Sequence, residues 1–130
     1  MRIRALVLLS GSLAAAIGCG GSGGGGGGGS PRGFCEDLAA VSCSRSYECY
    51  TAEELSSNMF PATEQECAEI VADKQMCGET TPKTLCGDKK YRPEKAEACL
   101  EELEQLTCTE VRDPHLMPAQ ATPSCTQVCG

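Results

Sequence analysis

The cysteines of this chain constrain its fold more than any other feature of the sequence. Eleven occur in 130 residues, and all but one lie between Cys35 and Cys129. Aromatic residues make up only 4% of the chain and Trp is absent, so little bulky material is available for a hydrophobic core. This composition is typical of small exported domains in which disulfides supplement a modest core. The cysteines expected to pair are Cys35, Cys43, Cys49, Cys67, Cys77, Cys86, Cys99, Cys108, Cys125 and Cys129.

The charge of the chain excludes several classes of partner. From Cys19 onward it carries 18 acidic and 9 basic residues, because Arg2 and Arg4 precede that point. Nucleic acids and anionic lipid surfaces attract clustered basic residues, and the sequence contains no basic stripe. We therefore expect no nucleic-acid partner and no membrane docking through charge.

Residues 1–18 have the pattern of an export signal. Arg2 and Arg4 form a basic start, and the run 5–17 contains only apolar and small residues. Such a run is too short to span a bilayer comfortably and suits the apolar region of a signal peptide. We therefore predict that residues 1–18 are removed from the mature protein.

The end of this segment, Ala16-Ile17-Gly18-Cys19, resembles the cleavage motif of bacterial lipoproteins. That family usually has Leu at the position of Ala16. The resemblance implies a lipid on Cys19 and a membrane anchor, and Gly20 implies the outer membrane, on its periplasmic or its surface-exposed face. Lipidation also explains the odd cysteine, because the other ten can then pair completely. An ordinary signal peptide with a chance cysteine is the alternative.

Residues 19–33 follow as the lipidated cysteine and a linker rich in Gly and Ser. The stretch 20–30 has no side chains that could offset the entropy of ordering, so it predicts a flexible tether. A phosphate-binding glycine loop would need a preceding strand and a following Lys-Ser/Thr pair, and neither is present. The folded domain is expected over residues 34–130.

Helical patterning fills the first two thirds of that domain. Residues 34–50 lack Gly and Pro and favour one or two helices. A second helix is expected between the capping-box residue Thr63 and the stop signal Gly78. Its predicted buried stripe comprises Cys67, Ile70, Val71, Lys74 and Cys77.

A third helix is expected from Pro93, because proline suits the first helical position. Its predicted apolar face comprises Ala96, Cys99, Leu100, Leu103, Leu106 and Thr107, opposite Glu94, Glu97, Glu101 and Glu104. After Cys108, prolines at 114, 118 and 123 forbid a continuous helix. The predicted fold is a small all-α, disulfide-rich domain of three to four short helices with an irregular C-terminal strap.

Helix geometry limits the disulfide pairing. At 1.5 Å per residue, Cys67 and Cys77 would lie about 15 Å apart, and Cys99 and Cys108 about 13 Å apart. A disulfide requires Cα atoms within about 7 Å, so neither pair can bond inside its own helix. The bridges must join helix to helix or helix to loop, and the pairing stays open among roughly 945 arrangements.

The cysteine-containing motifs of the domain also carry a resemblance. FCEDLAAVSC, FPATEQEC and YRPEKAEACLEELEQLTC, with a closing C-x3-C, are similar to those of small cysteine-rich lipoproteins and secreted proteins of some Gram-negative soil bacteria. That set has no assigned activity. The resemblance therefore supports the fold and the exported location and implies nothing about function.

Patterns that would carry chemistry are weak. The single histidine, His115, lies between a proline and a leucine, and complete cysteine pairing leaves no thiol nucleophile. Cys125 and Cys129 have a zinc-like spacing without a second ligand pair, and lysines occupy calcium-ligand positions after Asp88. Carboxylate pairs such as Glu101 with Glu104 and Glu53 with Glu54 are expected on solvated faces. We predict no catalytic, cofactor-binding or metal-binding residues.

The function predicted from these features is that of a non-enzymatic, lipid-anchored cell-envelope protein. Its disulfide-linked domain would bind an envelope or extracellular protein, or serve a structural role, through loops at residues 51–62 and 78–92. The alternative is a secreted-type inhibitor or toxin-like effector that acts at the cell surface, because compact disulfide scaffolds often serve that purpose. An enzyme ranks last.

Overall fold

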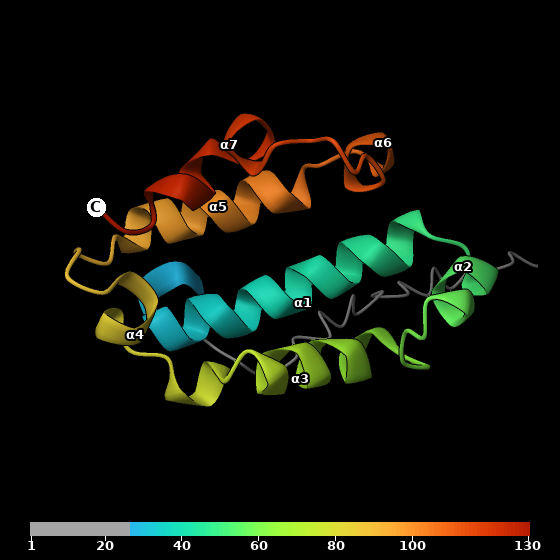
Figure 1. The fold of residues 1–130 in the computed structure, drawn as a ribbon, viewed down its shortest axis with the longest axis horizontal. Helices are drawn as coiled ribbons and strands as arrows, with labels where there is room; N and C mark the ends of the chain where they lie inside the picture. Colours follow the sequence, from blue (N-terminus) through green and yellow to red (C-terminus); the bar gives the residue numbers. More distant parts are fainter. Residues whose placement is uncertain (1–26) are drawn as a thin grey trace, which may run out of the picture.

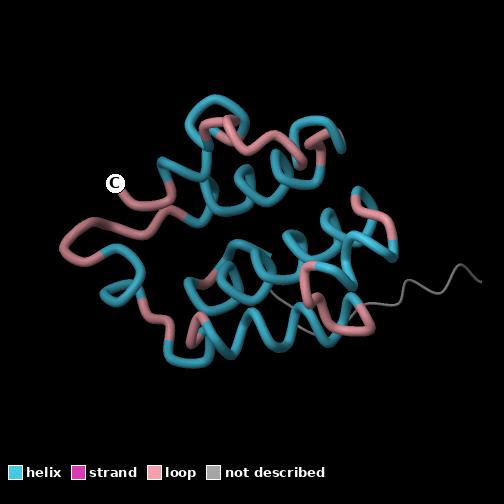
Figure 2. The backbone as a smooth tube through the Cα atoms, turned by 45° about the vertical axis from the view of Figure 1, so that its right-hand side comes forward, coloured by secondary structure: helices cyan, strands magenta, loops and turns pink. Residues whose placement is uncertain are grey.

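A computed structural model describes residues 27–130, and these residues form an all-α, disulfide-linked domain (Figures 1 and 2). The described chain contains seven α-helices and three 3-10 turns and no strand. The elements are η1 (Gly27–Gly29), α1 (Pro31–Cys49), α2 (Ala52–Ser57), α3 (Glu64–Lys74), η2 (Cys77–Glu79), α4 (Pro82–Cys86), α5 (Pro93–Glu104), α6 (Cys108–Val111), α7 (Pro118–Ala121) and η3 (Pro123–Gln127). The predicted fold class is confirmed.

The longest helix, α1, is the centre of the arrangement. It packs against α3 on one side and α5 on the other, and η3 covers the outer side of α5 (Figure 1). The short helices α2 and α6 lie near the C-terminal end of α1, and α4 lies near its N-terminal end. The domain therefore has two distinct ends, separated by the length of α1, which is about 28 Å for 19 residues.

A single helix covers the segment in which one or two were expected. Ser30 caps α1 by accepting a hydrogen bond from the Gly33 N–H, and Pro31 occupies the first turn. The Ser46 hydroxyl donates to the carbonyl of Ser42, one turn earlier, so it bonds within the helix and does not interrupt it. The helix therefore continues to Cys49.

The second long helix, α3, begins where the sequence predicts and ends earlier. Thr63 caps it through the Glu66 N–H, but the helix stops at Lys74 because Met76 adopts a left-handed conformation with φ 54°. Gly78, the expected stop, falls inside η2. The predicted buried stripe is wrong in part, because Ile70 is 43% exposed and Lys74 is also exposed. The Cys43–Cys67 disulfide holds this helix to α1, so its apolar side chains need not be fully covered.

The third long helix, α5, follows the predicted pattern over most of its length. Ala96, Cys99 and Leu100 are buried, and Leu103 packs against them. The helix ends at Glu104, and Thr107 is not part of its apolar face but caps the next helix, α6. The C-terminal segment is less irregular than expected. Its prolines prevent one long helix, yet two of them begin the short elements α7 and η3.

The hydrophobic core lies between α1, α4, α5 and the C-terminal segment. It comprises Phe34, Cys86, Tyr91, Ala96, Cys99, Leu100 and Val128. The ring centroids of Phe34 and Tyr91 are 6.4 Å apart, and an isolated β-bridge pairs Tyr91 with Cys129. The C-terminus is thus anchored against the start of α5 by backbone pairing as well as by its disulfides.

Residues 27–33 are part of the folded domain, ahead of the expected start at Phe34. Gly28 is buried, and the Tyr91 hydroxyl donates hydrogen bonds to the carbonyl oxygens of Gly28 and Ser30. Burial raises the pKa of Tyr91 to about 12, with smaller contributions from the carboxylates of Glu97 and Asp37. The predicted tether over residues 19–33 is therefore too long, because residues 27–33 belong to the domain.

Gly28 lies so close to α5 that a larger residue does not fit. An added Cβ would lie 2.5 Å from the backbone nitrogen of Glu97 and 2.8 Å from Ala96 atoms. We expect Gly28→Ala to lower the free energy of unfolding by about 1–3 kcal/mol, since backbone must move to admit the methyl group. Urea unfolding measures this loss. Gly29→Ala is the matched control, because nothing lies within 4 Å of its added Cβ; an equal loss in both variants would contradict the close packing.

Several sequence predictions fall on residues outside the described part. The signal peptide at 1–18, the lipidated Cys19 and the linker up to residue 26 lie there. Within residues 27–130, none of the helices is long and apolar enough to cross a membrane.

Candidate functional site

All ten cysteines between Cys35 and Cys129 form disulfides, and the pairing that the sequence left open is now defined. The pairs are Cys35–Cys77, Cys43–Cys67, Cys49–Cys108, Cys86–Cys129 and Cys99–Cys125. Cys67 and Cys77 each bond to α1 and not to each other, as expected, although Cys77 lies in η2 beyond the end of α3. Five disulfides in about one hundred residues indicate an oxidising environment, outside the cell or in its envelope.

The disulfides make α1 the framework for the other elements. Two of them hold α3 and η2 along α1, and a third joins the C-terminal end of α1 to α6. The remaining two hold the C-terminal segment to α4 and α5. Surfaces on this framework are therefore held in fixed relative positions.

The residues considered for chemistry are dispersed over the surface. His115 is exposed in the turn after α6, where its backbone N–H donates a hydrogen bond to the Oδ1 atom of Asp113 at 2.8 Å. Glu101 and Glu104 are exposed on α5. Across residues 27–130, no three or more His, Cys, Asp or Glu side chains are grouped so that they could hold a metal ion.

The two segments predicted to present a binding surface are neither simple loops nor neighbours. Residues 51–62 contain α2, and residues 78–92 contain α4. These helices lie near opposite ends of α1 (Figure 1). The segments therefore cannot contribute to one compact contact, and each end of the domain has to be considered separately.

The end that carries α4 contains an apolar groove of about 340 Å³. It lies between the start of α1, the end of α3 with η2, and α4. Its lining residues are Phe34, Cys35, Leu38, Gln75, Met76, Glu79, Thr80, Thr84 and Leu85. Apolar side chains dominate this lining, and the polar ones come from the chain between Gln75 and Thr84.

Met76 is the most distinctive residue of the groove. It is 65% exposed, and its left-handed backbone ends α3 beside the groove. Glu79 is exposed in η2 and adds a negative charge to the lining. The groove thus combines a wall suited to an apolar side chain with a carboxylate suited to a cationic group.

Asp37 is a half-buried acidic residue that the sequence did not reveal. Its Oδ2 atom is buried without a hydrogen-bond partner among the described residues. Burial raises the pKa of Asp37, and the neighbouring carboxylate of Glu36 raises it further. Because the folded-state pKa is raised, ionisation of Asp37 disfavours the fold, and stability is lost as pH rises through that pKa.

The opposite end, with α2 and α6, is organised by Arg112. Its guanidinium donates to the Cys49 carbonyl at 2.9 Å, forms an ion pair with Glu54, and lies 5.0 Å from the centroid of the Tyr50 ring. A hydrogen bond from the Thr51 N–H lowers the pKa of Glu54, and Arg112 lowers it as well. This end also exposes Met59, which is 91% accessible.

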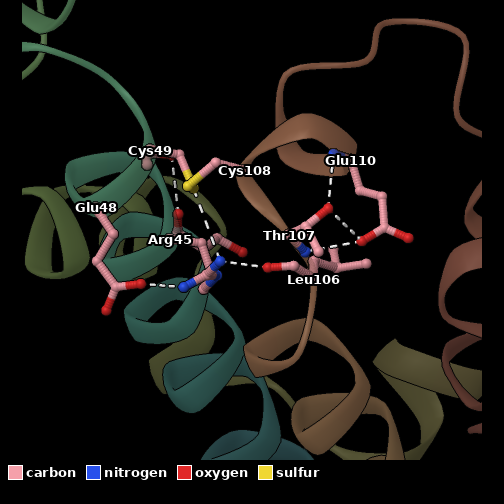
Figure 3. A network of polar contacts seen from close by, with 9 residues as sticks. Arg45, Glu48, Cys49, Leu106, Thr107, Cys108 and Glu110 are labelled. Atoms are coloured by element: carbon pink, nitrogen blue, oxygen red, sulfur yellow. Dashed lines mark hydrogen bonds and ion pairs between the residues drawn. A yellow bond between two sulfur atoms is a disulfide. The ribbon is translucent and has the colours of Figure 1, made fainter.

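A second arginine, Arg45, connects α1 to the chain just before α6 (Figure 3). Its guanidinium forms an ion pair with Glu48, donates to the carbonyl of Leu106, and approaches the sulfur of Cys49 at 3.7 Å. Thr107 and Glu110 cap α6 beside it through reciprocal hydrogen bonds. Arg45 was not singled out in the sequence analysis, although its spacing of four residues from Cys49 places both on the same face of a helix.

Comparison of the chain with protein-family models, with curated proteins and with solved structures finds no match.

Proposed function

We propose that the protein is a non-enzymatic, lipid-anchored cell-envelope protein that binds an envelope or extracellular protein through the groove between α1, η2 and α4. The apolar groove beside Met76 is the observation that carries this proposal. The partner is a protein segment with an apolar side chain that enters the groove and a Lys or Arg that pairs with Glu79. The excess of acidic residues in the chain favours such a cationic partner.

The anchor is supported by the pattern of residues 1–19 and by the disulfides of the domain. Cys19 and Gly27 are eight residues apart, so the extended chain between them spans at most about 28 Å. Outer-membrane anchoring through Cys19 would thus keep the domain close to the lipid surface. The groove lies at the end of the domain where this connection enters.

Replacement of the anchoring residue tests the anchor. We expect Cys19→Ser to lose its acyl chains, because the variant has no thiol at the position that accepts the lipid. Incorporation of labelled fatty acid in cells measures the loss. A variant that incorporates as much fatty acid as the unchanged protein would overturn lipid anchoring through Cys19.

Site-specific crosslinking in cells tests the groove. A photo-reactive residue at Gln75, beside the groove, is compared with one at Ser57, near the opposite end. The proposal predicts a crosslinked protein from position 75 and none from position 57. Crosslinking only from position 57, or from neither, would refute binding through the groove.

The partner identified by crosslinking is then purified, and its binding affinity is measured for two variants of the protein. Met76→Gly removes an exposed side chain from a left-handed position, and Met59→Gly makes the same change at the other end. We expect at least about tenfold weaker binding for Met76→Gly, or about 1.4 kcal/mol, and no change for Met59→Gly. An equal loss of affinity in both variants would exclude a specific contact at Met76.

The identity of the partner separates the two candidate functions. If the partner is a protease, and the domain released from Cys19 inhibits it, the result would favour a secreted-type inhibitor.

A further inference from the structure

The Cys49–Cys108 disulfide differs from the other four in its exposure. Among the ten paired cysteines, Cys108 is the only one whose residue is exposed, while the others are buried or half-buried. It lies where α6 begins (Figure 3), and α6 is at the end of the domain away from α4 (Figure 1). An attacking thiolate from another protein can therefore approach Cys108 more readily than any other cysteine of the domain.

The charge around this disulfide is also different. The Arg45 side chain is 18% exposed, its guanidinium lies 3.7 Å from the Cys49 sulfur, and its Nε atom is buried with no hydrogen-bond partner within residues 27–130. By contrast, the sulfurs of Cys125 and Cys129 lie 3.7 and 3.8 Å from the carbonyl oxygens of Cys99 and Leu85. A neighbouring cation stabilises a thiolate, whereas a carbonyl oxygen does not.

We propose that Cys49–Cys108 is a redox-active disulfide that exchanges with the dithiol of a thiol–disulfide oxidoreductase. A thiolate of the dithiol attacks the Cys108 sulfur, the Cys49–Cys108 bond breaks, and Cys49 leaves as a thiolate beside Arg45. The second thiolate of the oxidoreductase then attacks the first oxidoreductase sulfur, which is bonded to Cys108 in the mixed disulfide, and Cys108 is released. Two electrons and two protons pass to Cys49 and Cys108, and the dithiol becomes a disulfide.

Reduction changes how the C-terminal segment is held. The disulfide joins α1 covalently to α6, and non-covalent contacts hold the two together when it opens. These contacts include the hydrogen bonds that Arg45 donates to the Leu106 carbonyl and Arg112 donates to the Cys49 carbonyl. The other four disulfides are unaffected, so reduction loosens this end and leaves the groove at the other end intact.

Graded reduction of the full-length protein tests the proposal. The protein is treated with dithiothreitol for increasing times, the free thiols are alkylated, and peptide masses identify the cysteines that reacted. We expect Cys49 and Cys108 to be alkylated at least tenfold faster than every other cysteine. Faster reduction of another disulfide, or simultaneous reduction of all five, would overturn the proposal.

A substitution of Arg45 separates charge stabilisation from mere accessibility. Arg45→Gln should slow reduction of Cys49–Cys108 about threefold, because the leaving thiol has a higher pKa. In this variant, the alkylation rate of reduced Cys49 should also rise at a higher pH than in the unchanged protein, because the thiolate forms at a higher pH. Structural loosening would instead speed reduction, and either that result or an unchanged pH profile would contradict the role of Arg45. Arg32→Gln is the control, because Arg32 forms an ion pair on α1 with Glu36.

Discussion

Replacing Phe34 with alanine lowers the free energy of unfolding by about 3–5 kcal/mol. Phe34 is 5% exposed and packs against Tyr91, Ala96 and Leu100 in the core that joins α1 to α5. Its ring lies 6.4 Å from that of Tyr91, so Phe34 provides one of the two aromatic rings of this core. The variant loses the free energy gained by burying an aromatic ring away from water, and the cavity left behind adds a further cost.

Urea unfolding of the oxidised full-length chain measures the Phe34→Ala effect. Met117→Ala is the control, because Met117 is exposed and its truncation should change stability by less than about 0.5 kcal/mol. A loss below about 1 kcal/mol for Phe34→Ala would contradict the central place of Phe34 in the core that joins α1 to α5.

Replacing both Cys99 and Cys125 with alanine is expected to cost about 2–5 kcal/mol. This disulfide closes a loop of 26 residues and joins α5 to η3 inside the core. Its removal gives the unfolded chain more freedom and leaves the C-terminal segment held by the Cys86–Cys129 bridge and by backbone pairing. Denaturant unfolding under non-reducing conditions measures the change.

The Cys43–Cys67 disulfide provides the matched comparison. It closes a loop of 24 residues, so its removal changes loop entropy by nearly the same amount. Cys99 belongs to the hydrophobic core cluster and Cys43 does not, so the double alanine variant at Cys99 and Cys125 should be the less stable. A greater loss of unfolding free energy on removing Cys43–Cys67 would contradict this order and show that the α1–α3 disulfide stabilises the fold more.

The helical architecture followed from the sequence where periodic apolar residues coincided with start signals. Pro93 and the apolar face of Ala96, Cys99 and Leu100 predicted α5, and Thr63 predicted the start of α3. Cysteine spacing excluded bridges within one helix, because ten residues of helix separate two cysteines by about 15 Å. It could not choose among the pairings that remained, since these depend on how distant helices meet.

Backbone features were harder to predict than side-chain patterns. Met76 ends α3 in a left-handed conformation that sequence reasoning assigned to glycine, and Gly78 was therefore taken as the stop. Gly28 has no side chain to indicate burial, and its place in the domain depends on a carbonyl that accepts a hydrogen bond from Tyr91. Tertiary contacts that use the backbone leave little trace in composition.

The candidate groove was not predicted, and the reason is topological. Its lining comes from residues 34–38 and from residues 75–85, which the Cys35–Cys77 disulfide brings together. The sequence indicated residues 78–92 as a contact segment but gave no reason to join it to the start of α1. It likewise could not show that residues 51–62 lie near the opposite end.

The central claim is that an anchored chain carries a fully disulfide-linked domain, and intact mass tests it most directly. The protein is taken from a membrane fraction and alkylated with and without prior reduction. The account predicts a chain that begins at Cys19 with added acyl mass, no alkylation before reduction, and alkylation of all ten cysteines from Cys35 to Cys129 after it. A chain without acyl mass, or one in which most cysteines react before reduction, would contradict it.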